Sequence, residues 1–196
     1  MQNNILICKL LYAFLTEVIL LQHKHQISAN KIKVFISSSM NDAVFLEQRC
    51  AIKSFLDRVP LYDCFIIETA ASPTHVITRY ETQVQRSDII ILILQTELRP
   101  GVVKEFNVAK NYNKRIFAYI HNGTKTSDLE DFIKDKIHPL STSTTFSDTM
   151  QLIDKIEHDL LEDLVTQYVE LYQRNQYLEE LLKKVSTAGT GHSVTP

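Results

Sequence analysis

Glycine is scarce in this sequence, which has four glycines among 196 residues. Neither a GxGxxG segment nor a GxxxxGK(S/T) segment occurs. Both motifs use glycine to let the backbone approach the phosphates of a nucleotide. Their absence argues against a dinucleotide-fold oxidoreductase and against a P-loop nucleotide hydrolase.

The sequence also has few cysteines and little net charge. The three cysteines, Cys8, Cys50 and Cys64, are scattered and lack the spacing of metal ligands. We therefore expect buried thiols in a reduced, cytoplasmic protein and no metal site. The formal net charge is -2 and the isoelectric point is about 6.4. Because no segment clusters Lys and Arg among aromatic residues, nucleic acid is not an expected partner.

Residues 1–30 are predicted to form an apolar helix followed by a polar linker. Lys9 and Glu17 interrupt the apolar run, whereas a membrane span needs about 20 apolar residues with few charges. Apolar residues would cover almost the whole circumference of this helix. The pattern favours burial against the domain or against a second subunit over contact with a membrane.

The central part of the chain, residues 31–146, has the pattern of an α/β domain. Ile89–Leu94 is an unbroken apolar run rich in β-branched residues, which predicts a strand buried on both faces of a parallel sheet. Further strands are expected at Ile32–Ser37, Asp63–Glu68, Arg115–His121 and, as a short edge strand, Leu140–Phe146. Flanking helices are expected at about Asp42–Arg58, at Thr74–Ser87, after Pro100, and at Ser127–Ile137. The residues of the first helix expected to face inward are Val44, Phe45, Ala51, Ile52, Phe55 and Leu56.

Polar residues gather where the predicted strands end. Ser37, Ser38, Ser39 and Asp42 follow the first strand and precede a helix. Hydroxyl groups and the N–H groups of a helix start can cradle a phosphate or the hydroxyls of a ribose. A capping role for Ser39 is the simpler alternative, and the two roles are compatible.

Two later strands add candidates at the same edge. Thr96 lies in the polar loop after Ile89–Leu94, and His121 ends its own strand. The carboxyl ends of parallel strands are where open α/β sheets bind ligands. Thr96 and His121 are therefore candidate ligand contacts, although a histidine at a strand end can equally be structural.

Glu105 is the candidate for chemistry. It lies one turn inside the helix that follows the central strand, near Val102, Phe106 and Ala109 on one face. This position places a carboxylate just beyond the carboxyl end of the sheet. The alternative is that the helix dipole favours a glutamate near a helix start whatever its function.

From Ser147 to about Val185 the pattern predicts one long helix, followed by a disordered tail at residues 186–196. Apolar residues alternate spacings of three and four in an a/d heptad seam, with Asn175 at an a position. A polar a residue fixes register in two-stranded coiled coils, so we expect a homo-oligomer. The seam could instead pack on the domain or on the N-terminal helix. Its members are Leu161, Leu164, Tyr168, Leu171, Asn175, Leu178, Leu182 and Val185.

Three segments, KVFISSSMND, RSDIIILIL and VVKEFNVAKNYNKRIFAYIH, together resemble the TIR-like and nucleoside deoxyribosyltransferase-like domains of bacteria, over about residues 31–137. The resemblance implies a short flavodoxin-like parallel sheet. It also implies cleavage or transfer of an N-glycosidic bond, often that between nicotinamide and ribose in NAD, which would be a substrate and not a cofactor. Glu105 would be the catalytic residue, Ser37, Ser38 and Ser39 would border the nucleotide, and Asp42 would orient it or cap the helix.

Two functions follow from this resemblance. The first is a glycosidase for NAD or a nucleoside that self-association activates, with a role in defence against phage. The second is a catalytically silent interaction or signal-binding module that the terminal helices assemble. A Glu105-dependent release of base distinguishes them.

Overall fold

The structure is a computed structural model that describes residues 31–38, 43–66, 76–140 and 143–188. The predicted N-terminal helix and residues 189–196 of the predicted tail therefore lie outside the described residues. Residues 186–188, predicted to be disordered, instead belong to the last helix, which continues to Ala188. So do two of the candidate ligand contacts, Ser39 and Asp42.

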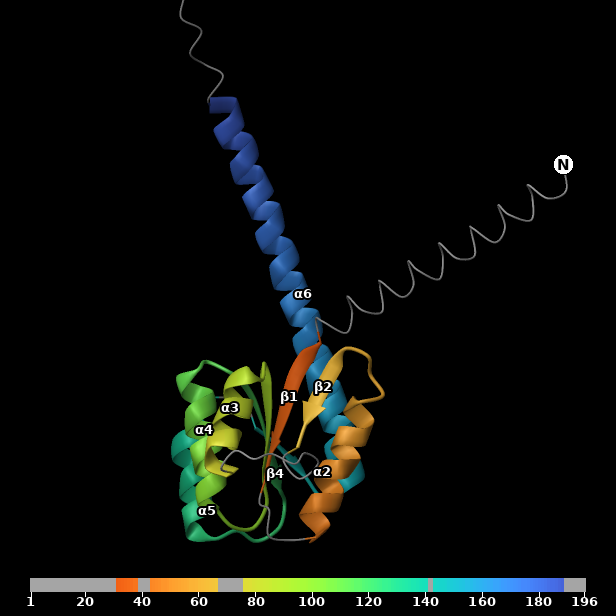
Figure 1. Cartoon of the computed structure of the whole chain (residues 1–196). Coiled ribbons are helices and arrows are strands. Elements are labelled where there is room, and N and C mark those ends of the chain that lie inside the picture. Colours follow the sequence, from red (N-terminus) through yellow and green to blue (C-terminus); the bar gives the residue numbers. More distant parts are fainter. Residues whose placement is uncertain (1–30, 39–42, 67–75, 141–142, 189–196) are drawn as a thin grey trace, which may run out of the picture. The chain divides into compact units, whose positions relative to one another are not determined.

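Five strands of the described chain form one parallel sheet in the order β2-β1-β3-β4-β5 (Figure 1). This is the flavodoxin-like order, and it confirms the predicted fold class. The three central strands have the predicted bounds, whereas both edge strands differ by a few residues. The strands are β1 (Ile32–Ser37), β2 (Tyr62–Phe65), β3 (Ile89–Leu94), β4 (Arg115–His121) and β5 (Ser143–Phe146).

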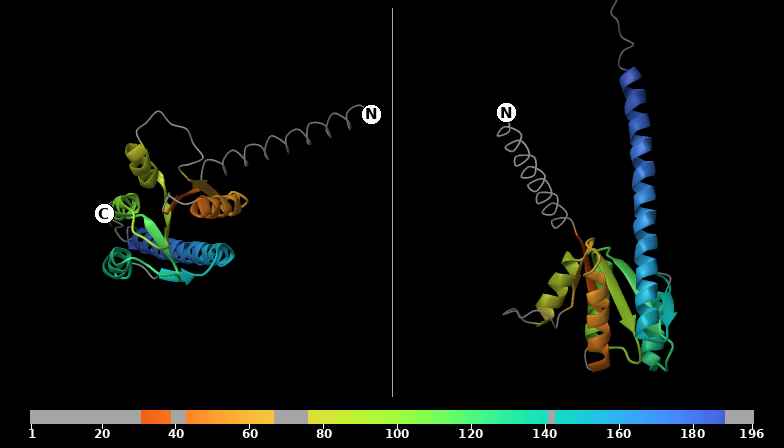
Figure 2. Two further views of the ribbon diagram at one scale, coloured as in Figure 1. Left: turned by 90° about the horizontal axis from the view of Figure 1, so that it is seen from below. Right: turned by 90° about the vertical axis from the view of Figure 1, so that its right-hand side faces the viewer.

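Helices cover both faces of the sheet, and Figure 2 shows α2 across the sheet from α3, α4 and α5. A π-helical turn, η2, continues α5, so the predicted helix over Ser127–Ile137 is present but changes its hydrogen-bond pattern at Ile133. The helices are α2 (Ala43–Leu56), α3 (Val76–Arg86), α4 (Pro100–Asn111), α5 (Ser127–Phe132), η2 (Ile133–Ile137) and α6 (Thr149–Ala188).

The central strand β3 anchors the core because all six of its residues are buried. On the face covered by α4 and α5, Leu92 and Leu94 pack with Phe106 and Phe132, whose rings meet edge to face at 5.2 Å. Removing such side chains from water contributes about 1.5–3 kcal/mol each. This packing holds the start of α4 against the carboxyl ends of the strands, where a ligand site is expected.

The Ser87-Asp88 pair before β3, part of the TIR-like resemblance, has a structural role here. The Lys33 backbone N–H donates to Asp88 Oδ2 at 2.9 Å, and the Asp88 N–H donates to the Lys33 carbonyl at 2.8 Å. The Ser87 hydroxyl donates to the Gln83 carbonyl at the end of α3. These bonds fix β3 to β1 at the amino edge of the sheet, away from the end of β1.

Asn113 ends α4 in a left-handed conformation with φ 50°. The Lys114 N–H donates to the Ala109 carbonyl at 2.9 Å, and the Asn113 N–H donates to the Lys110 carbonyl at 3.1 Å. This pair of bonds is a Schellman cap, in which asparagine substitutes for the usual glycine.

We therefore expect Asn113→Val to lower the free energy of unfolding by about 1–2 kcal/mol, because a β-branched residue at positive φ is strained. Asn113→Gly should leave the stability unchanged or raise it slightly. Urea unfolding measures both effects. Asn111→Val is the matched control. Asn111 is exposed and is the last residue of α4, and asparagine and valine have similar helix propensities. Equal losses at the two positions would contradict the strain.

The last helix, α6, is 40 residues long. A boundary between two compact units falls after Leu152. The buried apolar side chains of α6 are Leu152, Ile156 and Leu160. Beyond them Leu164 is half-buried, and large apolar side chains from Val165 to Val185 are exposed. Among the described helices, none combines the length and the apolar composition needed to cross a membrane.

Candidate functional site

Glu105 and Ser37 meet at the carboxyl end of β1. The Ser37 hydroxyl donates a hydrogen bond to Glu105 Oε2 with an oxygen–oxygen distance of 2.5 Å. Both side chains are buried, with exposed fractions of 1% for Ser37 and 7% for Glu105. Hydrogen bonds to a carboxylate are short and about twice as strong as neutral ones. The structure thus brings together two of the residues that the sequence singled out.

Glu105 lies on the buried face of α4, together with Val102, Phe106 and Ala109. A carboxylate at such a position is costly to bury unless it is hydrogen-bonded. The helix dipole does not account for it, because Glu105 is the sixth residue of α4 and the dipole's effect falls off within the first turn. Its position therefore agrees better with a function than with helix stabilisation.

A slot of about 210 Å³ opens between α3 and α4 beside Glu105. Lys104 and Glu81 of α3 both line the slot and form an ion pair, with a nitrogen–oxygen distance of 2.9 Å. Lys104 thus pairs across the helices and not with its neighbour Glu105. The slot is lined by Tyr80, Glu81, Pro100, Gly101, Lys104, Glu105 and Val108.

The other face of the β1 end carries a buried arginine. Successive strand residues point to opposite faces, so Ser38 turns away from Ser37. Arg49 of α2 is 2% exposed and donates through Nη1 to the Ser38 hydroxyl at 2.7 Å. Neighbouring Gln48 accepts from Gln95 Nε2, just after β3, at 2.5 Å. Arg49 thus holds Ser38 on the side opposite to Glu105, and Gln48 joins α2 to the end of β3.

His121 lies apart from the Glu105–Ser37 pair, and Thr96 has a backbone contact of its own. The Gly123 N–H donates to His121 Nδ1 at 3.0 Å, so Nε2 carries the proton and donates to the Ser147 carbonyl at 3.1 Å. Nδ1 therefore stabilises the turn after β4, and Nε2 joins the end of β4 to the residue after β5. β4 is two strands from β1, about 10 Å at the usual strand spacing. Thr96 is exposed, and its carbonyl accepts from the Thr126 N–H at 2.9 Å.

Sequence reasoning missed Arg49, Gln48 and the slot. Gln48 and Arg49 share the inward face of α2 with Ile52 and Leu56, which hydrophobic periodicity did identify. Gln48 lies four residues before Ile52, and Arg49 lies three residues before it. This spacing places both on the face that holds Ile52, and it was the available signal.

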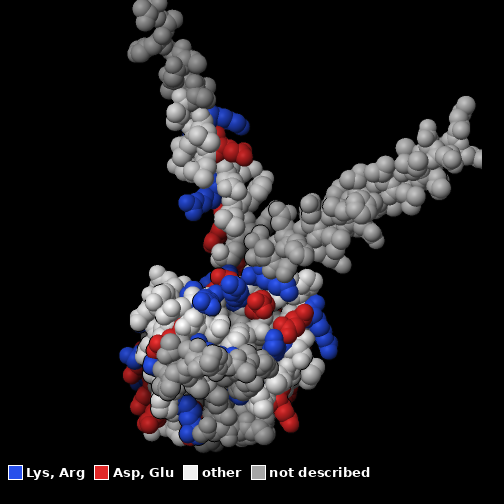
Figure 3. All heavy atoms as spheres, in the orientation of Figure 1, with Lys and Arg blue, Asp and Glu red and all other residues white. Residues whose placement is uncertain are grey.

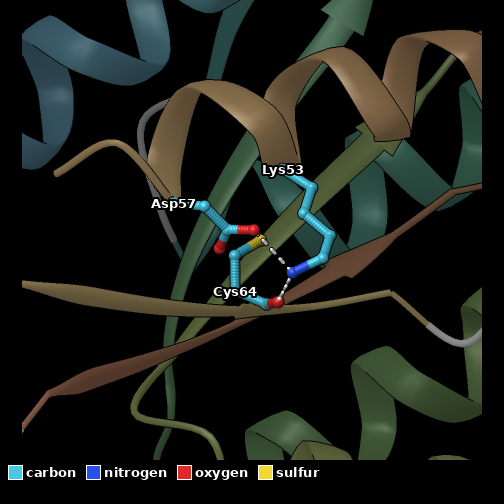
Figure 4. A network of polar contacts seen from close by, with 3 residues as sticks. All are labelled: Lys53, Asp57 and Cys64. Carbon is cyan, nitrogen blue, oxygen red and sulfur yellow. Dashed lines mark hydrogen bonds and ion pairs between the residues drawn. The ribbon is translucent and has the colours of Figure 1, made fainter. Parts of the chain in front are cut away.

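A second polar cluster joins α2 to the edge strand β2 (Figure 4). Lys53 Nζ donates to Asp57 Oδ2 at 2.9 Å and to the Cys64 carbonyl at 2.6 Å. Burial raises the pKa of the Cys64 thiol to about 12, against the opposing effect of the Lys53 charge. A thiol with so high a pKa stays protonated at neutral pH and is a poor nucleophile. This cluster supports the sheet edge and offers no reactive site. Cys64 has the buried thiol that was predicted, whereas the same prediction for Cys50 is wrong, because Cys50 lies on the exposed side of α2.

The Cys64 thiol should make stability depend on alkaline pH. Between pH 9 and 12 the unfolded chain loses this proton while the folded chain, with its thiol pKa raised to about 12, keeps it. The free energy of unfolding should therefore fall as pH rises, by about 1.4 kcal/mol per unit from this group. Urea unfolding between pH 8 and 10.5 measures the slope, and Cys64→Ala should flatten it. Equal slopes in the two proteins would contradict the burial effect.

Charges of both signs are interspersed over the face of the molecule seen in Figure 3. Among the described residues, His158, Asp159 and Glu162 form a group of possible metal ligands on α6. His158 and Glu162 are largely exposed and lie 3.9 Å apart, as residues four apart on a helix commonly do. The group therefore does not indicate a metal site.

No family model matches the sequence, and no curated protein matches it. The fold is similar to that of the CMP N-glycosidase BcmB of Clostridium botulinum, with a TM-score of 0.50, 13% identity, and coverage of 64% of this chain and 97% of that one. A conserved protein of Enterococcus faecalis gives a TM-score of 0.47 at 13% identity, covering 66% and 99%. A de novo designed Rossmann-fold protein gives 0.41 at 14%, covering 68% and 90%. At these identities the likeness to BcmB shows a shared fold, and membership of the TIR-like group stays a prediction.

Proposed function

We propose that this protein is an N-glycosidase that cleaves the bond between base and sugar in a nucleoside or nucleotide, with Glu105 as the catalytic residue. The observation that carries the proposal is the buried Glu105 carboxylate. It accepts a 2.5 Å hydrogen bond from Ser37 at the carboxyl end of β1 and also lines the slot between α3 and α4.

The chemistry fits a single oriented carboxylate. As the C1′–N bond breaks, its electron pair leaves with the base and positive charge develops on the sugar ring. A carboxylate held against C1′ stabilises this charge or attacks the carbon to form an ester. Water then forms the new C1′–O bond, and where an ester has formed the bond between C1′ and Glu105 breaks and the carboxylate is regenerated. The proton lost by water is released to the base or to solvent. The Ser37 hydroxyl keeps the Glu105 carboxylate in one orientation through this sequence.

The size of the slot limits what it holds. Its volume of about 210 Å³ is below the roughly 300–1,000 Å³ of sites for drug-sized ligands. One ring of the substrate fits inside, between Tyr80 and the first turn of α4, while the rest of the nucleotide lies outside. The aromatic ring and apolar walls suit a flat base, and the carboxylate then lies next to its sugar bond.

Two substrate classes are the leading candidates. The fold is shared with an enzyme named as a CMP N-glycosidase, which supports a pyrimidine nucleoside monophosphate. The resemblance of the sequence to TIR-like domains supports NAD, whose nicotinamide leaves as a neutral molecule and needs no acid. In either case Glu105 acts on the same type of bond, the N-glycosidic bond between base and sugar. A role in defence against phage belongs to the TIR-like hypothesis only.

The test is direct measurement of free base. Full-length protein is incubated with CMP, with the other nucleoside monophosphates, with nucleosides and with NAD, and released bases are separated by liquid chromatography. We expect release from at least one class by the natural protein and release lowered roughly a thousandfold by Glu105→Gln. Release that persists undiminished in Glu105→Gln would remove Glu105 from the mechanism. No release from any class would favour a silent signal-binding module.

A further inference from the structure

The second half of α6 exposes an apolar stripe. Tyr168 is 68% exposed, Leu182 70% and Val185 70%, values that are unusual for large apolar side chains in a row along one element. Leu161, Leu171 and Leu178 are exposed as well. Contiguous exposed apolar surface of this kind marks an interaction site.

We infer that this stripe pairs with the same stripe of a second copy, as a parallel, in-register, two-stranded coiled coil over residues 161–185. The helix is continuous through the whole seam, as a coiled coil requires. The a positions are Leu161, Tyr168, Asn175 and Leu182, and the d positions are Leu164, Leu171, Leu178 and Val185. This inference is independent of the proposed function.

Asn175 determines the relative direction of the two helices. In a parallel in-register pair, a faces a, so the two Asn175 amides meet and hydrogen-bond to each other. In an antiparallel pair, a faces d, and every d residue of this seam is apolar. Any antiparallel register would therefore bury Asn175 against an apolar side chain without a partner, which is costly.

The flanking charges agree with the parallel arrangement. In a parallel pair, a g residue lies near the e residue five positions later on the other helix. Arg174 is at g and Glu179 is at e, so each dimer forms two Arg174–Glu179 ion pairs, one on each side. Both side chains are exposed in the single chain, and they have the charges that the pairing needs.

Charge reversal tests the pairing. The natural full-length chain should have about twice the mass of one 22.6 kDa chain by light scattering. Arg174→Glu alone and Glu179→Arg alone should each weaken the dimer, raising its dissociation constant about tenfold. The double variant R174E/E179R should restore it, and so should a mixture of the two single variants. A monomeric natural chain would overturn the inference.

A crosslink tests direction and register. In a Cys8→Ser and Cys50→Ser background, Leu182→Cys places one thiol at an a position, so a parallel in-register pair forms a disulfide between like residues on mild oxidation. Gln173→Cys, at an outward f position, is the matched control and should stay uncrosslinked. A dimer in which Leu182→Cys does not crosslink, or crosslinks no better than Gln173→Cys, would overturn the parallel arrangement.

Discussion

Glu105→Gln is expected to lower base release roughly a thousandfold, about 4 kcal/mol of transition-state stabilisation. The amide keeps the shape of the side chain and can still accept from Ser37, but it has no charge to set against the positive sugar ring. Losing one preorganised electrostatic contact commonly costs a factor of 10²–10³. The measurement is the rate of base release at saturating substrate, with circular dichroism to confirm the fold.

Stability separates a catalytic Glu105 from a structural one. A buried carboxylate kept for chemistry is a stability cost, so the melting temperature of Glu105→Gln should equal or exceed that of the natural chain. Glu81→Gln is the matched control, because Glu81 also lines the slot but is only half-buried and forms an ion pair with Lys104. It should retain most of the activity. Equal losses in the two variants would show that slot integrity, and not the Glu105 charge, limits the rate.

Ser37 is a positioning residue in this mechanism, since it acts through Glu105. Ser37→Ala removes a buried donor from the carboxylate, and we expect kcat to fall about ten- to a hundredfold while KM changes little. In the Glu105→Gln background the same substitution should have almost no effect, because the group that it positions is already absent. Additive losses in the double variant would contradict this coupling.

The three central strands could be predicted to the residue because burial on both faces leaves a strong signal. β3 is six consecutive apolar residues, and β1 and β4 carry similar runs. The edge strands β2 and β5 have one neighbour each, so fewer side chains are constrained and their ends could not be placed as well. Edge strands are also short in general.

The site could be predicted only in part. The sheet topology alone brings the end of β1 next to the helix after β3, so the proximity of Ser37 and Glu105 followed from the pattern. The buried position of Arg49 did not follow, because periodicity assigns a charged residue to the solvent face until a tertiary partner such as Ser38 is known. The slot arises from how α3 packs on α4, which no local sequence signal records.

Filling that slot is expected to abolish most activity without touching Glu105. Gly101, the second residue of α4, lines the slot, and a Cβ built there has nothing within 4 Å. Gly101→Leu therefore adds an apolar side chain where the base is proposed to lie, favoured by about 0.8 kcal/mol per buried CH₂. Substrate must displace this side chain, so kcat/KM should fall roughly a hundredfold, mostly through KM.

Gly101→Ala is the matched control. The added methyl group has room, and alanine in place of glycine at a compatible backbone conformation raises the free energy of unfolding by about 0.4–1 kcal/mol. We expect this variant to be more stable and to keep its activity within about twofold. The difference between leucine and alanine at one position then measures occupation of the slot itself. If Gly101→Leu retained the natural KM, the base would have to bind outside the space between α3 and α4. The Glu105 carboxylate would then have to reach the sugar from a different side.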